Sequence, residues 1–204
     1  DFDVVNTDVI LNRMSVKDGR LVLPDGMSYA IMLLPDQVSM PLDVLKKISD
    51  LVRAGATVVG PKPKTVPGLN NWEKENIALN QLSGELWGAS DGKTIFENKY
   101  GQGHVIWGNS ADEVLKKKHI EPDFSFAGTS EIDFIHRTTD IAEIYFLRNE
   151  KEEPVNAMCY FRVREMYPEI WDASTGTISR IADYTINKGV TGFEIRLPPH
   201  GSVF

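Results

Sequence analysis

The feature that most constrains the fold is a strand–helix–strand pattern between residues 29 and 60. Residues 29–34 form a continuous apolar run, which is typical of a strand buried on both faces. Pro41 then suits the first turn of a helix, and apolar residues recur at helical spacing until Gly55, where a helix stop is expected. Residues 57–60 follow as a second short strand. Such a βαβ unit crosses over right-handed and places its strands parallel, so it predicts an α/β domain.

The segments around this unit predict further α/β structure. The pairs Asp18-Gly19 and Asp25-Gly26 are turn formers, because glycine takes positive φ without penalty and aspartate bonds its own backbone. A second helix is expected over residues 72–87, and KTIFENKYGQGHVIWG predicts a hairpin that turns at residues 101–103. Ser110 is a candidate cap for a last helix.

The pattern changes near residue 120. After Pro122 the helical spacing ends, and short strands follow one another closely, among them EIDFIHR, EIYFLRNE, AMCYFRV and GFEIRL. Short strands at this spacing are typical of an antiparallel β-sandwich. The predicted organisation is therefore an α/β domain with an amidotransferase-like (flavodoxin-like) parallel sheet over residues 1–120, followed by a β-sandwich module over residues 121–204.

Charge, apolar content and cysteine usage exclude several partners. The net charge of −7 argues against a nucleic-acid partner, which would require a basic patch. No stretch reaches the 18 or so apolar residues of a membrane helix, so no membrane partner is expected, and no signal peptide occurs in these residues. Cys159 is the single cysteine, which excludes an internal disulfide; we expect it in an apolar core.

Motifs for metals and nucleotides do not occur. HExxH, CxxC, GxGxxG after a strand and the phosphate-binding P-loop are missing, so no cofactor or metal is expected in this segment. The four histidines are scattered, and we interpret each as a surface or strand-packing residue. Residues 172–176 (DASTG) resemble part of a calcium loop but lack the closing glutamate, which favours a tight turn.

Four residues are candidates for a crevice in the α/β half. Ligands of doubly wound sheets bind beyond the carboxyl ends of the strands, and Asp36, Lys62, Lys64 and Trp72 are expected near that edge. The alternative is a surface loop stiffened by prolines, and the composition favours this alternative. Neither strand of the βαβ unit is followed by a nucleophile in a Gly-flanked turn, which argues against amidotransferase-type catalysis.

Three aromatic residues are candidates for sugar stacking in the β half: Tyr160, Tyr167 and Trp171. Trp171 has a second interpretation, as a side chain that fills the sandwich core, and the pattern favours the core. A glycosidase needs two carboxylates on either side of the scissile bond. The 29 acidic residues leave such a pair open, but none stands in a recognisable frame.

Several segments together resemble a known family. DFDVVNTDVILNRMSVKDGRLVLPDGMSYAIMLLPD, LVRAGATVVGPKPKTVPGL, ELWG, GQGHVIWG, IDFIHRTTDIAEIYFLRN, PEIWDASTG and LPPHGSVF are similar, in this order, to the later part of glycoside hydrolase family 106, the bacterial α-L-rhamnosidases. In that family the catalytic carboxylates and a calcium ion belong to a (β/α)₈ barrel, and the region similar to this chain follows the barrel. The resemblance therefore assigns no catalytic residue to these 204 residues. It also implies a further sheet strand upstream of Asp1.

Three functions follow as hypotheses. The first is a non-catalytic accessory region of a secreted or periplasmic α-L-rhamnosidase, with the catalytic barrel of the same chain as its partner. The second is a carbohydrate-binding module in the β half, which requires exposed aromatic side chains. The third is a free-standing enzyme of amidotransferase-like or flavodoxin-like fold, which requires a crevice at Asp36 and Lys62.

Overall fold

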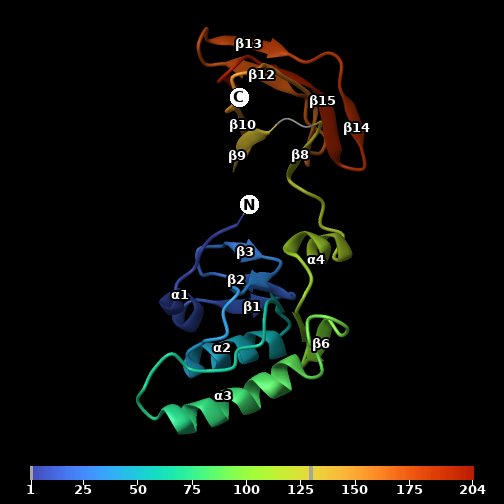
Figure 1. Ribbon diagram of the computed structural model, residues 1–204. Helices are drawn as coiled ribbons and strands as arrows, with labels where there is room; N and C mark the ends of the chain where they lie inside the picture. The colour runs from blue at the N-terminus through green and yellow to red at the C-terminus, as the bar shows by residue number, and fades with distance from the viewer. Residues whose placement is uncertain (1, 129–130) are drawn as a thin grey trace. The chain divides into compact units, whose positions relative to one another are not determined.

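The computed structural model describes residues 2–128 and 131–204, and the chain divides into two compact units. Unit 1 comprises residues 1–120 and unit 2 comprises residues 121–204. Unit 1 contains the helices and a mixed sheet, and unit 2 is built of antiparallel strands (Figure 1). The predicted combination of an α/β part with an all-β part is confirmed at this level.

The main sheet of unit 1 has the strand order β4-β5-β7-β6. β4 pairs parallel with β5 and β5 parallel with β7, whereas β6 joins β7 as an antiparallel hairpin. The strands are β4 (Met32–Leu33), β5 (Thr57–Val59), β7 (Gly103–Ile106) and β6 (Glu97–Tyr100). The predicted parallel pair and the predicted hairpin are both present.

Helices α2 (Leu42–Arg53) and α3 (Trp72–Trp87) lie side by side in Figure 1 and supply much of the core of unit 1. The buried face of α2 follows the predicted spacing, and Trp87 at the end of α3 is fully buried. The Trp87 indole N–H donates to the carbonyl of Gly60 at 3.1 Å, so the end of α3 is fixed to the end of β5. Helix α4 (Ala111–Lys117) begins with a capping box formed by Ser110 and Glu113.

A small antiparallel sheet, β1-β2-β3, precedes the main sheet. Its strands are Ser15–Lys17, Arg20–Val22 and Ser28–Tyr29, and helix α1 (Thr7–Asn12) comes before them. Asp18 and Gly19 both have positive φ (52° and 73°), which confirms the predicted turn. The expected single buried strand at residues 29–34 is wrong: Tyr29 pairs with β2, whereas Met32 pairs with β5, and Leu33 is 53% exposed.

Unit 2 contains a three-stranded and a four-stranded antiparallel sheet around one apolar core, together with a two-stranded hairpin. The first sheet has the order β16-β10-β9 and the second β14-β15-β11-β8. In the first sheet the strands are Ser202–Val203 (β16), Glu143–Asn149 (β10) and Ile132–Thr138 (β9). In the second they are Thr185–Asn187 (β14), Val190–Leu197 (β15), Val155–Phe161 (β11) and Phe124–Ala127 (β8).

A hairpin extends the first sheet of unit 2. Its strands are β12 (Glu169–Asp172) and β13 (Thr177–Arg180), joined by the predicted turn at residues 172–176. The Asp172 carboxylate accepts the Ser174 N–H at 2.8 Å, and Gly176 has φ 71°. The backbones of Trp171 and Phe204 exchange two hydrogen bonds, at 2.7 and 3.1 Å, which place β12 beside the end of β16.

Candidate functional site

Three of the four crevice candidates of unit 1 follow the parallel strands β4 and β5 in the chain. Asp36 follows β4 and Lys62 follows β5, and the Lys64 N–H donates to the carbonyl of Val38 at 2.7 Å, so the two loops run side by side. Trp72 begins α3 and is 44% exposed. None of the four lines the hollow formed by residues around Asp3 and Tyr29 or the groove of unit 2 described below. A crevice formed by them stays a prediction.

The three aromatic candidates of unit 2 do not form one platform. Trp171 is 52% exposed and Tyr167 85% exposed, and both line the same groove. Tyr160 lies on β11 in the other sheet and is not part of that groove. The favoured interpretation of Trp171 as a core residue is wrong: Ile170 points into the core, so its neighbour Trp171 points out of the strand on the opposite side.

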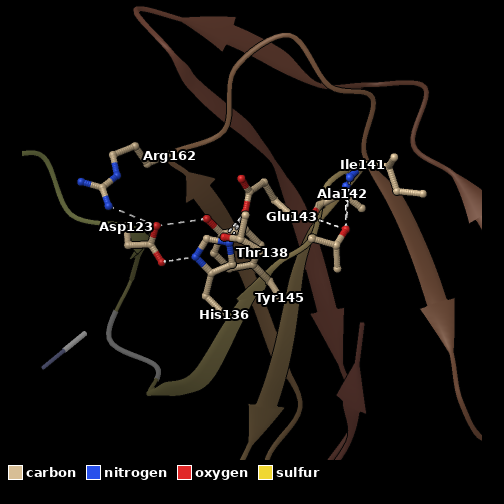
Figure 2. A network of polar contacts seen from close by, with 9 residues as sticks. Asp123, His136, Thr138, Ile141, Ala142, Glu143, Tyr145 and Arg162 are labelled. Atoms are coloured by element: carbon tan, nitrogen blue, oxygen red, sulfur yellow. Dashed lines mark hydrogen bonds and ion pairs between the residues drawn. The ribbon is translucent and has the colours of Figure 1, made fainter. Parts of the chain in front are cut away.

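The most densely connected group of titratable side chains in the described residues of unit 2 surrounds His136 on β9. Its Nδ1 lies 2.8 Å from a carboxylate oxygen of Asp123, and its Nε2 lies 2.7 Å from a carboxylate oxygen of Glu143 (Figure 2). Asp123 precedes β8, whereas Glu143 begins β10; in the β9–β10 ladder Glu143 is opposite Thr138, two residues from His136. The side chains of His136 and Asp123 are only 14% and 12% exposed. We call these three residues the histidine latch.

Neighbouring groups hold the histidine latch in place. The Tyr145 ring stacks on the His136 ring, with centroids 4.0 Å apart and planes 9° apart, and its hydroxyl lies 3.2 Å from Asp123. The Arg162 guanidinium lies 3.4 Å from the same carboxylate, and the Thr138 hydroxyl donates to Glu143 at 2.7 Å (Figure 2). The histidine latch thus joins β9, β10 and the segment that leads into β8.

Each ring nitrogen of His136 lies within hydrogen-bond distance of a carboxylate oxygen, so both nitrogens are engaged. Burial, with the negative charge of Asp123, raises the pKa of the Tyr145 hydroxyl well above its usual value, so this hydroxyl stays protonated and donates. A general base needs a free nitrogen within reach of the substrate. His136 has none, so the arrangement suits stabilisation of the sheet edge.

Sequence reasoning missed the histidine latch, although one signal was present. Ile132, Phe134 and His136 alternate along β9, so His136 lies on the apolar face of that strand. A histidine on such a face needs buried partners. Asp123 is 13 residues away and joins it only through the sheet pairing, which no local pattern reveals.

A groove of about 880 Å³ opens on unit 2 beside the histidine latch. One wall is the start of β10 with the turn before it, and the other wall is β12 with residues 165–168. Its floor consists of Phe161, Phe193 and Ile195, which belong to the core face of the second sheet. Its charged lining residues are Glu143, Glu165, Glu169 and Asp172. Glu165 has φ 55°, a left-handed conformation that a glutamate rarely adopts.

Cys159 lies in the core of unit 2. Burial of Cys159 in β11 raises the pKa of its thiol to about 12, which makes it an inert core residue, as predicted. Within residues 2–128 and 131–204, no group of three or more histidine, cysteine or acidic side chains is arranged to hold a metal ion. In the same residues, no helix is long and apolar enough to cross a membrane.

Comparison with known proteins identifies the family. The family model described as alpha-L-rhamnosidase, glycoside hydrolase family 106, matches residues 1–186. A protein of Formosa agariphila named "Putative beta-glucuronidase" is 33% identical over the whole chain, which spans 16% of that protein. The rhamnosidase of Novosphingobium sp. PP1Y superposes over 98% of this chain with a TM-score of 0.87 and 29% identity.

The chain thus spans only about a fifth of these relatives, 19% in the case of the Novosphingobium rhamnosidase. A more distant likeness is to Gan42B, a GH42 β-galactosidase from G. stearothermophilus, with a TM-score of 0.53 and 14% identity over 86% of this chain and 31% of that chain; it concerns the fold alone. The resemblance inferred from the sequence is confirmed: the chain belongs to glycoside hydrolase family 106, the α-L-rhamnosidase family.

Proposed function

We propose that this chain is a non-catalytic accessory region of a longer α-L-rhamnosidase-like glycoside hydrolase. Its function is to support the catalytic barrel of that protein and to shape the rim of the substrate cleft. The reaction of the longer protein is hydrolysis of terminal α-L-rhamnose, served by carboxylates outside these residues. The observation that carries the proposal is a row of exposed apolar side chains on the outer face of unit 2.

This row crosses five strands at one level. Phe146 on β10 is opposite Ile135 on β9, and the Phe204 ring lies 5.0 Å from the Phe146 ring. The backbone of Phe204 exchanges two hydrogen bonds with that of Trp171 on β12. Trp171 is opposite Ile178 on β13. Four members of the row are between 44% and 56% exposed: Ile135, Trp171, Ile178 and Phe204. A continuous apolar surface of this kind marks a protein interface, and we assign the catalytic barrel to it.

The test compares this chain with the longer protein that contains it. A chromogenic α-L-rhamnoside should be hydrolysed by the longer protein and not by this chain at equal concentration. In the longer protein, Ile135→Asp should lower the thermal unfolding midpoint and the activity together. Ile186→Asp is the matched control, since Ile186 is similarly exposed (50%) but lies on β14 in the other sheet. Turnover by this chain alone, or equal effects of both substitutions, would contradict the proposal.

For unit 1 we propose the amidotransferase-like fold. The parallel pairs β4-β5 and β5-β7 and the helices α2 and α3 support this assignment, as does the fold likeness to the GH42 β-galactosidase. An additional strand upstream of Asp1 would extend the sheet, and a crystal structure of the longer protein would show whether it pairs beside β4. We further propose a secreted or periplasmic location for the longer protein, which cell fractionation tests.

The second candidate function is carbohydrate binding by unit 2. It is favoured by the exposure of Tyr167 and Trp171 on one groove, because aromatic faces stack on sugar rings. Titration of the chain with L-rhamnose should then change tryptophan fluorescence, and Trp171→Ala should abolish the change, whereas Trp72→Ala in unit 1 should not. Unchanged fluorescence at millimolar sugar would remove this candidate.

A further inference from the structure

The groove of unit 2 has the dimensions and backbone arrangement of a gap in a sheet. β16 lies between β10 and β12: its register with β10 pairs Val203 with Leu147 and Ser202 with Arg148. On its other side, Phe204 exchanges two backbone hydrogen bonds with Trp171. Because β16 separates β10 from β12 at this level, the two strands are two strand spacings apart, or about 9.6 Å. Their separation therefore admits one strand.

Beyond Phe204 the same two strands continue, and they line the groove. The part of β10 that precedes Leu147, from Glu143 to Phe146, has β9 on one side and, in the described residues, no strand paired on the other. Similarly, Glu169 and Ile170 of β12 pair only with β13 among the described strands. Both stretches line the groove together with the core-face residues of the second sheet that form its floor.

The direction of the free backbone groups follows from the observed ladder. The Asn149 N–H donates to the carbonyl of Gly201, so β10 directs the backbone of Asn149 and of every second residue before it toward β16. Tyr145 and Glu143 therefore present their N–H and C=O groups to the groove. On β12 the backbone of Trp171 faces β16, so that of Glu169, two residues before it, faces the groove as well.

The backbone of the groove walls suits a polypeptide strand. The floor residues Phe161, Phe193 and Ile195 offer no hydrogen-bonding group, and the carboxylates of the lining belong to Glu143, Glu165, Glu169 and Asp172. The walls offer backbone donors and acceptors at strand spacing, which another strand satisfies by β-augmentation. We propose that this groove is the seat of a polypeptide strand that prolongs β16 and pairs antiparallel with both β10 and β12.

The register fixes the pattern of that strand. Val203 is buried and Phe204 points outward, so the first and third positions beyond Phe204 point to the floor and the second points to solvent. By continuation of the ladder, these three positions lie beside Tyr145, Ile144 and Glu143. An occupant with apolar residues at the first and third positions fits, and one with the opposite pattern does not.

The test adds four residues directly after Phe204 in two patterns of equal composition. The chain extended by Val-Thr-Val-Thr directs both valines to the floor, and the chain extended by Thr-Val-Thr-Val directs them to solvent. We expect the first extension to raise the thermal unfolding midpoint of unit 2 by about 5 °C and the second to change it little. Hydrogen exchange of the Tyr145 amide should slow in the first chain only.

Two results would overturn the proposal. Equal midpoints and equal Tyr145 exchange in the two extended chains would show that the groove does not accept a strand in this register. Protection of the Tyr145 amide by L-rhamnose in the original chain, lost in both extended chains, would show that the groove is a saccharide site. Both measurements use this chain alone, so they do not depend on the role of the catalytic barrel.

Discussion

The two units of this chain stabilise their sheets in different ways. In unit 1, helices α2 and α3 contribute apolar side chains to the core, including the fully buried Trp87. Unit 2 has no helix among its described residues, and polar side chains hold its strands together at several points. Asn149 is fully buried there, and its side chain donates to the carbonyls of Glu153 and Pro198 and accepts from the Lys151 N–H. The histidine latch adds a hydrogen-bonded link at the opposite end of β10.

This difference indicates which interactions determine the fold of each unit. A helix packed on a sheet buries one broad apolar stripe, so its position is set by nonspecific, additive contacts. Two sheets without covering helices need features that fix register, because a slip by one residue exchanges the buried and exposed faces. Paired polar groups serve this purpose, since a slip would leave them buried and unpaired. Unit 1 should therefore respond most to lost volume, and unit 2 to lost polar pairing.

The largest expected effect tests the volume side of this comparison. Trp87→Ala should lower the free energy of unfolding of unit 1 by about 4 kcal/mol, because it opens a large cavity and removes the bond to Gly60. Urea denaturation followed by helical circular dichroism measures this. Trp72→Ala is the matched control on the same helix, and it should change stability by less than about 0.5 kcal/mol because Trp72 is exposed. Similar losses for both would break the comparison.

The next effect tests the polar side in unit 2. His136→Ala should lower the free energy of unfolding of unit 2 by about 3 kcal/mol, because it leaves the Asp123 and Glu143 carboxylates poorly solvated and without the ring nitrogens that they share. Thermal unfolding monitored in the near ultraviolet measures the loss. Adding Asp123→Asn and Glu143→Gln to His136→Ala should recover a large part of it, since the uncompensated charges are then removed. If the triple variant remained as unstable as His136→Ala, the lost packing against Tyr145 would be the main cause of the destabilisation.

How far the sequence predicts this structure depends on how local each feature is. The hairpin of β9 and β10, the turn at residues 172–176 and the cap at Ser110 were predictable, because each is determined by neighbouring residues. The run at residues 29–34 was misassigned because its apolar character does not say that Tyr29 and Met32 pair in different sheets.

The sites show the same dependence more strongly. Trp171 pairs with Phe204, 33 positions later in the chain, and the partners of His136 come from β10 and from the segment before β8. The sequence alone predicts only the face of β9 on which His136 lies, from the alternation of apolar residues along that strand. Membership of the family was accessible because it rests on the succession of many segments, whereas the crevice at Asp36 and Lys62 remains a prediction.

A smaller effect is a loss of stability at alkaline pH, which is expected in the core of unit 2 and not in that of unit 1. Burial raises the pKa of Cys159 from 9.0 to about 12, so in this range the unfolded chain loses the thiol proton while folded unit 2 keeps it. Stability from this group is therefore present below pH 9 and falls above it by about 1.4 kcal/mol per pH unit. Urea midpoints measured between pH 8.5 and 10 check this, and Cys159→Ala should remove the slope. The unfolding of unit 1, which has no cysteine, should show no such change in the same variant.

The smallest effect concerns acid pH and two exposed turns, one in each unit. Asp91 in unit 1 accepts the hydroxyl of Thr94 and the N–H groups of residues 93–95, and these bonds hold its pKa well below the usual range. Asp172 in unit 2 accepts from Ser174 in the same manner, which lowers its pKa as well. Both folded pKa values lie below the unfolded ones. The stabilisation is therefore present above the unfolded pKa near 3.8 and is lost as the pH falls toward the folded values.

Asparagine at either position keeps an acceptor oxygen but cannot titrate. Asp91→Asn should therefore flatten the acid dependence of unit 1 unfolding between pH 4 and 2 and leave that of unit 2 unchanged, and Asp172→Asn should do the reverse. Thermal midpoints at half-unit pH steps, followed by helical dichroism for unit 1 and by Cys159 labelling for unit 2, measure the two slopes separately. If either substitution changed both slopes equally, the two units would unfold in one cooperative transition. The stabilities of their two cores could then not be measured separately.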